Sequence, residues 1–344
     1  MRSPLKQSSV VLVGLFFCLR TVPCLAAVKT DVVELLNGDR ITCEIKKLDR
    51  GKLTVKTDGI GTISIEWNDI ARVASGAIYD VELNSGERYF GTLVRGDSQT
   101  LLVVTSLGAQ RLIMDTVVRI NPLGGNLWKR LDGSISAGFN FTQANVQTQW
   151  TFNSTVSYRG RQWLTSLTGE SSLTTNEDTP RQTRNQLTIS GERFLVRRWS
   201  ALAFSQLQQN EELSLNLRAV LGGGIQRILK QSNNALVTAA GGAAFTREQY
   251  SGGEDQSVAE GVAGLRWEFF TFDGRSTNLS VGVLTFYALS GEARVRLELN
   301  ASFKSDIVGD LYWSVNTFES YNGAPPAGQK KNDAGVSAAV GWSF

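Results

Sequence analysis

The chain has 344 residues, a formal net charge of +3 at pH 7 and 19% charged residues, which is enough for two folded units. Its 35 Lys and Arg residues nearly balance its 32 Asp and Glu residues, which argues against a strongly basic nucleic-acid binder and against an acidic disordered tail. The chain has no histidine, which excludes Ser-His-Asp and Cys-His nucleophilic sites and His-ligated zinc.

Residues 1–26 have the layout of a secretory signal peptide, with basic residues before the apolar stretch Val10–Leu19 and small residues after it. Cleavage is expected after Ala26 or Ala27. A transmembrane anchor is the alternative, but about ten apolar residues fall short of the roughly twenty that span a bilayer as a helix. Removal of the signal leaves Cys43 as the remaining cysteine, so no intramolecular disulfide is expected.

Residues 28–122 contain an internal repeat. The stretch LLNGDRITCEIKKLDRGKLTVKT lines up with LNSGERYFGTLVRGDSQTLLVVT, and IARV lines up further on with VVRI. Short alternating segments separated by turn formers predict strands, and two small SH3-like or Sm-like β-barrels in tandem are expected. Such barrels bind ligands through one face or act as spacers. Trp67 is the first residue to test for binding, although an aromatic in so small a barrel commonly belongs to the core.

Residues 123–130 belong to NPLGGNLWKR, whose Pro and paired Gly predict a linker. From 131 to 344 the chain shows period-two alternation in segments of roughly nine to eleven residues, which is typical of the tilted strands of a transmembrane barrel. Segments start near 132, 148, 162, 183, 199, 212, 235, 256, 277, 292, 310 and 333. The pattern therefore predicts an antiparallel barrel of about twelve strands.

The alternation assigns side chains to an apolar face (oily) and a polar face (wet) of each strand. Near residue 295 the predicted lipid face carries Val295 and Leu297, and the lumen face carries Arg294, Arg296 and Glu298. A second segment is assigned in the same way, with Ser214, Asn216 and Arg218 on the wet face and an oily face made of Leu213, Leu215, Leu217, Ala219 and Leu221.

A soluble β-sandwich or jelly roll is the alternative, because it has the same alternation with the apolar face inward. Three features favour the membrane: aromatic residues near strand ends, a second face too polar to bury cheaply, and the C-terminal stretch VSAAVGWSF. Trp342 and Phe344 in that stretch resemble the signal that the outer-membrane barrel assembly machinery reads. Short turns are expected on the periplasmic side and longer polar loops outside.

Several stretches between about Trp128 and Phe344 resemble a known family. They are GSISAGFNFTQANVQ, YRGRQWLTSLTGE, RFLVRRWSAL, NLRAVLGGGIQR, AAGGAAFTREQY and GVSAAVGWSF. The region resembles the salt-induced outer-membrane protein family (YdiY-like, domain of unknown function 481). The resemblance does not include the N-terminal repeat. It implies an outer-membrane barrel of poorly defined activity and supplies no catalytic residue.

Seven charged residues are predicted to face the lumen: Arg218, Glu260, Arg266, Glu268, Arg294, Arg296 and Glu298. Two roles are open for them. They form either a structural salt-bridge network that fills a narrow barrel, or a constriction that tunes the passage of small anions or polar solutes.

Two functions are therefore carried forward for a protein of the bacterial outer membrane with its N-terminal repeat in the periplasm. One is a narrow, porin-like pore for small solutes. The other is a non-conducting structural or stress-linked envelope protein whose repeat binds peptidoglycan or a partner protein. The expected partners also include outer-membrane lipid and the barrel assembly machinery, but no nucleic acid. Since no carboxylate pair stands out, no enzymatic activity is expected, nor any cofactor or metal.

Overall fold

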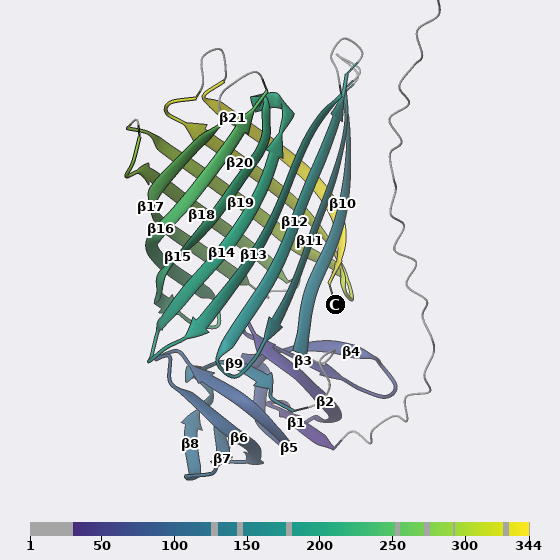
Figure 1. Ribbon diagram of the computed structural model, residues 1–344. Coiled ribbons are helices and arrows are strands. Elements are labelled where there is room, and N and C mark those ends of the chain that lie inside the picture. Colours follow the sequence, from purple (N-terminus) through teal and green to yellow (C-terminus); the bar gives the residue numbers. More distant parts are fainter. Residues whose placement is uncertain are drawn as a thin grey trace, which may run out of the picture.

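The computed structural model describes residues 30–124, 130–142, 147–176, 181–251, 255–271, 276–291, 293–325 and 330–343. The predicted signal peptide, most of the predicted linker and Phe344 lie outside these residues. The described chain forms an N-terminal β domain and a closed β-barrel (Figure 1). We call the end of the barrel beside the N-terminal domain the proximal end and the opposite end the distal end.

The N-terminal domain is one nine-stranded sheet with strand order β4-β3-β2-β1-β5-β6-β7-β8, and β9 pairs with both β2 and β5. Its elements are β1 (Asp31–Leu35), β2 (Arg40–Asp49), β3 (Lys52–Lys56), β4 (Thr62–Glu66), η1 (Trp67–Asp69), β5 (Ile70–Leu83), β6 (Arg88–Arg95), β7 (Thr100–Thr105), β8 (Gly108–Ile113), η2 (Met114–Thr116) and β9 (Val117–Pro122). The sequence repeat is visible in this order. Each copy has four antiparallel strands, a 3-10 turn and a strand that returns to pair with the first.

The two copies share the long strand β5 and one hydrophobic core. Leu48, Val81 and Val103 in this core are fully buried. Trp67 is buried as well, and its indole Nε1 donates a hydrogen bond to the carbonyl of Met114 at 2.8 Å. Trp67 and Met114 each open the 3-10 turn of their copy. Trp67 therefore belongs to the core, which is the alternative considered in the sequence analysis, and it holds the two copies together instead of facing a ligand.

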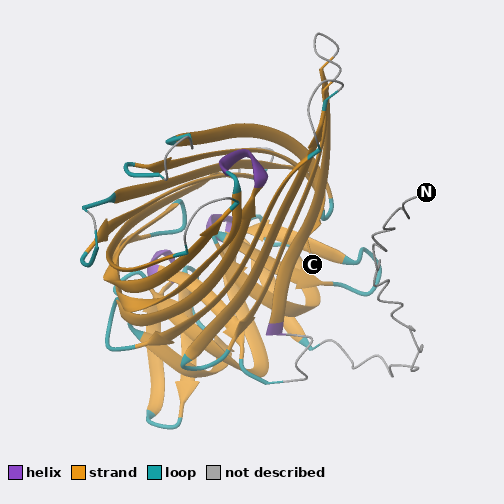
Figure 2. Ribbon diagram, turned by 45° about the horizontal axis from the view of Figure 1, so that its top comes forward, coloured by secondary structure: helices purple, strands orange, loops and turns teal. Residues whose placement is uncertain are grey.

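The barrel consists of twelve antiparallel strands that close into a ring, as the alternation predicts (Figure 2). They are β10 (Leu131–Thr142), β11 (Gln147–Arg159), β12 (Trp163–Thr175), β13 (Gln182–Phe194), β14 (Trp199–Asn210), β15 (Leu215–Gln231), β16 (Ala235–Tyr250), β17 (Gln256–Thr271), β18 (Thr277–Ala288), β19 (Val295–Val308), β20 (Leu311–Asn322) and β21 (Asn332–Ser343). Every strand begins within three residues of its predicted start.

Apolar side chains point out of the barrel and polar side chains point into it. On β10, Ile135 and Phe139 are 45% and 54% exposed, whereas Ser136 between them is 5% exposed. Many of the buried barrel residues are Gln, Asn, Ser, Thr, Arg and Glu. This orientation is that of a membrane barrel and excludes the soluble sandwich, which needs the opposite polarity. The helices of the described chain are single 3-10 turns, too short to span a bilayer.

The start of β15 departs from the predicted alternation. A 3-10 turn, η5 (Glu211–Leu213), precedes the strand, and the side chain of Asn210 caps it by accepting hydrogen bonds from two backbone N–H groups. The ladder with β16 then shifts register between Leu215 and Leu217. Because such a bulge reverses the phase of the side chains, Leu215 is buried inside beside Leu213 and Tyr250. The prediction that Leu213 and Leu215 face lipid is therefore wrong.

The ring closes between β10 and β21. Among the described residues this seam has four pairs, from Ser134↔Ser343 to Ala137↔Val340. Every other pair of neighbouring strands in the barrel has at least eleven. Trp342 lies in the seam, where it pairs with Ile135 and is 53% exposed on the outer surface.

Candidate functional site

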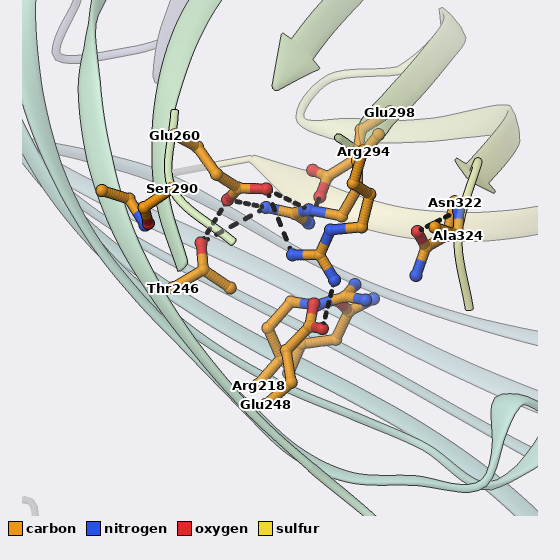
Figure 3. A network of polar contacts seen from close by, with 12 residues as sticks. Arg218, Thr246, Glu248, Glu260, Ser290, Arg294, Glu298, Asn322 and Ala324 are labelled. Atoms are coloured by element: carbon orange, nitrogen blue, oxygen red, sulfur yellow. Dashed lines mark hydrogen bonds and ion pairs between the residues drawn. The ribbon is translucent and has the colours of Figure 1, made fainter. Parts of the chain in front are cut away.

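A cluster of charged side chains lies inside the barrel near the distal end (Figure 3). We define the distal cluster as Arg218 on β15, Glu248 on β16, Glu260 on β17, Arg294 just before β19, and Arg296 on β19. Glu248 accepts from Arg218 Nε at 2.7 Å and from Arg294 Nη1 at 2.6 Å. Glu260 accepts from Arg296 Nη2 at 2.8 Å and is 3.3 Å from Arg294 Nη2. The arginines thus alternate with the carboxylates in one continuous network.

Almost none of this network is accessible to solvent. The five side chains are between 0% and 4% exposed. Glu298, which is 12% exposed, lies 3.4 Å from Arg296 and brings the cluster to three arginines and three glutamates, a formal charge of zero. The ring of Phe286 lies 4.2 Å from the Arg296 guanidinium. Burial is tolerated because each charge has a partner of opposite sign at hydrogen-bonding distance.

Contacts at the distal end cross the lumen as well as following the wall. Glu248 and Arg294 join β16 to the segment before β19, and two strands separate these elements in the ring. On the other side, Asn210 on β14 donates to Asp333 on β21 at 2.5 Å. Arg184 on β13 lies 3.8 Å from the same carboxylate. The distal lumen is therefore bridged from two directions.

The N-terminal domain lies across the proximal end, and Glu82 on β5 is the centre of the contact. Its carboxylate accepts from Arg119 of the same domain at 3.2 Å and from two barrel residues, Arg159 at 2.9 Å and Gln231 at 3.1 Å. Burial by itself raises the pKa of Glu82, but the charges of Arg119 and Arg159 outweigh it and hold the pKa below its ordinary value. Glu82 therefore joins the domain to β11 and β15 as a carboxylate.

Other ion pairs surround this centre. Three basic residues of the N-terminal domain each reach a carboxylate of a different barrel strand. The pairs are Arg50–Glu268 at 2.7 Å, Lys47–Asp132 at 2.6 Å and Lys52–Asp306 at 3.5 Å. They contact β17, β10 and β19. The interface is thus polar and spread around the rim.

The carboxylate of Asp49 lies among the basic residues that the N-terminal domain brings to this interface. It lies 3.3 Å from Arg119 and next to Arg50 in the chain. Burial tends to raise the pKa of Asp49, yet the charges of Arg119, Arg50 and Lys47 lower it to about 2.

Close approach of the two units requires a glycine at the β5–β6 turn. Gly86 has a φ of +85°, in the region that favours glycine. A Cβ atom there would lie 2.8 Å from Cγ of Arg198 and 2.9 Å from the backbone of Arg197. Beside it, Arg198 Nε donates to the carbonyl of Asn84 at 3.1 Å.

Residues 135–344 match the family described as "Protein of unknown function, DUF481". The chain belongs to this family. The family resemblance predicted from the sequence is thereby confirmed, and it covers the barrel without the N-terminal domain. No curated protein matches the chain.

Several solved structures are similar to the DUF481 barrel. A bacterial polysaccharide outer membrane secretin shares 7% identity, with a TM-score of 0.34 over 62% of this chain and 97% of that one. The translocator domain of the autotransporter NalP from Neisseria meningitidis shares 13% identity, with a TM-score of 0.35 over 62% and 87%. The beta domain of the Bordetella autotransporter BrkA shares 11% identity, with a TM-score of 0.32 over 62% and 98%.

The seven charged residues singled out in the sequence fall into two groups in the DUF481 barrel. Arg218, Glu260, Arg294, Arg296 and Glu298 meet at the distal end. Arg266 and Glu268 lie near the proximal end instead, 2.7 Å from each other and beside Arg50 of the N-terminal domain. They do not form one ring.

The sequence analysis did not single out Glu248, although this carboxylate accepts hydrogen bonds from Arg218, Arg294 and Tyr250. The alternation could have indicated its inward position, because Thr246, Glu248 and Tyr250 follow the outward-facing Phe245 at alternating positions. Asn210 and Asp333 were also missed. Among the described residues, no group of His, Cys, Asp and Glu side chains is arranged to hold a metal ion.

Proposed function

We propose that the protein is an outer-membrane barrel that does not conduct solutes, because its lumen is closed by the distal cluster and by the N-terminal domain. The observation that carries this proposal is the burial of the distal cluster, whose five charged side chains are at most 4% exposed. Charged groups that line an open pore keep their contact with water and with the passing ions. Those of the distal cluster are paired with one another instead.

The N-terminal domain lies in the periplasm under this proposal. Connections at the proximal end are two to five residues long, whereas those at the distal end are four to nine. Outer-membrane barrels have short periplasmic turns and longer external loops, so the connection lengths support a periplasmic proximal end. Export through the predicted signal peptide agrees with this orientation.

A non-conducting barrel with a periplasmic domain fits a structural or stress-linked role in the envelope. We propose that the protein acts in this role and not as an enzyme. The domain would hold peptidoglycan or a periplasmic protein through the surface turned away from the barrel. That surface includes the tip of the β7–β8 hairpin, where Leu107 is 92% exposed. Trp67 takes no part in such contacts, because it is buried.

Planar-bilayer recording on the refolded full-length protein tests the closed lumen. We expect no steady conductance under an applied potential. The same sample, run boiled and unboiled on a gel, must show the mobility difference of a folded barrel. A steady conductance from protein that passes this control contradicts the proposal and restores the narrow pore.

The envelope role is tested separately by sedimenting the full-length protein with purified peptidoglycan sacculi and by crosslinking it in cells. Retention on sacculi, or one reproducible crosslinked protein, is expected. A chain that neither cosediments nor crosslinks contradicts the anchoring role but leaves the closed lumen unaffected.

A further inference from the structure

A cavity of about 260 Å³ lies between the N-terminal domain and the proximal parts of strands β11 to β17. We call it the proximal chamber. The N-terminal domain contributes the ends of β2, β5 and β9 to its lining, including Asp49, Glu82 and Arg119. The barrel contributes inward-facing side chains such as Gln226 and Arg266. The chamber thus exists because the domain closes the barrel at this end.

The lining carries more positive than negative charge. Its arginines are Arg50, Arg88 and Arg119 from the domain, and Arg159, Arg197, Arg198 and Arg266 from the barrel. Its carboxylates are Asp49, Glu82, Glu192 and Glu268. Seven arginines minus four carboxylates leave a formal charge of +3, which falls to +2 when Asp80, the buried partner of Arg88 behind the lining, is included. Since guanidinium groups stay protonated and the surrounding wall has a low dielectric constant, the chamber attracts anions.

Some of these guanidinium groups remain open to a ligand. Arg266 and Arg50 share the single carboxylate Glu268, yet their side chains are 59% and 46% exposed. Arg197 has no carboxylate partner among the described residues, whereas the guanidinium of Arg198 already donates to the backbone carbonyls of Asn84 and Leu229. The distal cluster is the opposite case, because there each charge is neutralised and buried.

Two buried polar atoms in the chamber lining have no hydrogen-bond partner in the described structure. They are Nε of Arg159 and Oε1 of Gln231. Gln231 is 7% exposed, and its other side-chain atom, Nε2, donates to Glu82. An unpaired buried donor and an unpaired buried acceptor are each costly.

Aromatic rings hold the cationic groups in position. The guanidinium groups of Arg159 and Arg88 lie 4.3 and 4.7 Å from the ring of Phe194, and Arg50 lies 5.6 Å from the ring of Phe270. Both rings also line the chamber, where they offer apolar surface. Guanidinium groups that are fixed before binding lose less conformational entropy when they clamp an oxyanion.

We propose that the proximal chamber binds a small polar molecule that carries a phosphate or carboxylate group. Its volume of about 260 Å³ is slightly below the roughly 300–1,000 Å³ of small-molecule sites, so the occupant has the size of a monosaccharide derivative. This site goes beyond the closed lumen proposed above and does not depend on conductance.

Isothermal titration calorimetry on the refolded full-length protein tests the proposal. The probes are glucose 6-phosphate, glucuronate, inorganic phosphate and uncharged glucose. We expect saturable binding of the first two probes, weaker binding of inorganic phosphate and none of glucose. Raising the salt concentration should weaken the binding. The absence of binding by both organic anions overturns the proposal, as does equal binding of glucose and its phosphate.

Arg197→Gln and Arg266→Gln should each weaken binding by about tenfold, since each removes charge-assisted hydrogen bonds. Arg247→Gln is the matched control, because Arg247 is also 59% exposed and paired with one carboxylate, Asp255, but lies at the distal end. Equal affinity of all three variants overturns the assignment of the site. Bilayer recording is independent of this titration, so the closed lumen and the anion site can fail separately.

Discussion

The two units of this chain have the same period-two alternation with opposite polarity. In the N-terminal domain the alternate apolar residues, such as Leu53 and Val81, are fully buried. In the barrel the alternate apolar residues, such as Leu221 and Phe245, are 67% and 54% exposed. One chain therefore contains one β structure that buries its apolar side chains away from water and another that turns them outward toward lipid. The alternation by itself does not specify which face is inside.

The two units also differ in what holds their interiors together. The domain has a continuous apolar core that includes Trp67, so burial of apolar surface stabilises it. The barrel has a closed ring of backbone hydrogen bonds and an interior of polar and ionic pairs, as a lipid solvent requires. Substitutions that exchange polarity should therefore have opposite effects in the two units.

The largest effect is expected from Glu260→Gln in the barrel interior. This change leaves Arg294 and Arg296 without the carboxylate that they share. Removing one partner of a buried ion pair costs about 3–5 kcal/mol. Urea unfolding in detergent micelles, followed by the gel mobility of the folded barrel, measures the loss.

Glu298→Gln provides the control for this prediction. Glu298 is more exposed, and its only ion pair in the described structure is a long contact of 3.4 Å to Arg296. We expect its loss to cost much less, about 1 kcal/mol or below. If both variants unfold at the same urea concentration, the barrel interior does not depend on the distal cluster.

A smaller effect is expected when the same substitution is made on the outer surfaces of the two units. Leu221→Arg places a charge on the lipid face near the middle of β15 and should destabilise the barrel by about 2–4 kcal/mol. Leu107→Arg, at a leucine that is 92% exposed on the N-terminal domain, should leave stability unchanged. Refolding into vesicles and urea titration compare the two, and equal stability would contradict a lipid-facing β15.

The smallest effect concerns the acid sensitivity of the N-terminal domain. The pKa of Asp49 is lowered from 3.8 to about 2. Its contribution to the free energy of unfolding is therefore complete above about pH 4 and is lost as the pH falls toward 2. This contribution is at most about 2 kcal/mol. Pulse proteolysis in urea, between pH 5 and pH 2, should show a steeper decline for the wild-type domain than for Asp49→Asn. If the stability of both proteins falls equally with pH, Asp49 is not the cause of the acid sensitivity.

Most of the barrel fold could be predicted because each strand has a local signal in the sequence. The strand starts, the ring of twelve and the polarity of the faces follow from alternation, turn residues and the aromatic residues near strand ends. The start of β15 could not, because the cap at Asn210 and the register shift after Leu215 reverse the faces without interrupting the apolar pattern.

The charged sites were less predictable, since they depend on distances across the lumen. The sequence assigns Arg218 and Arg266 to the same face, but they lie in different sites because their strands present them at opposite ends of the barrel. The contact between Glu82, Arg159 and Gln231 had no local signal at all. It joins residues from three segments that the sequence places far apart, and the docking of the two units brings them together.

The seam between β10 and β21 has a consequence for how the barrel opens. Four pairs of described residues join these strands, whereas other neighbouring strands of the barrel share at least eleven. When the barrel is heated or pulled, its strands separate first where the fewest residue pairs join them. Amide hydrogens of β10 and β21 should therefore exchange with solvent deuterium before those of β15 and β16, and the C-terminal strand is the first to leave the ring.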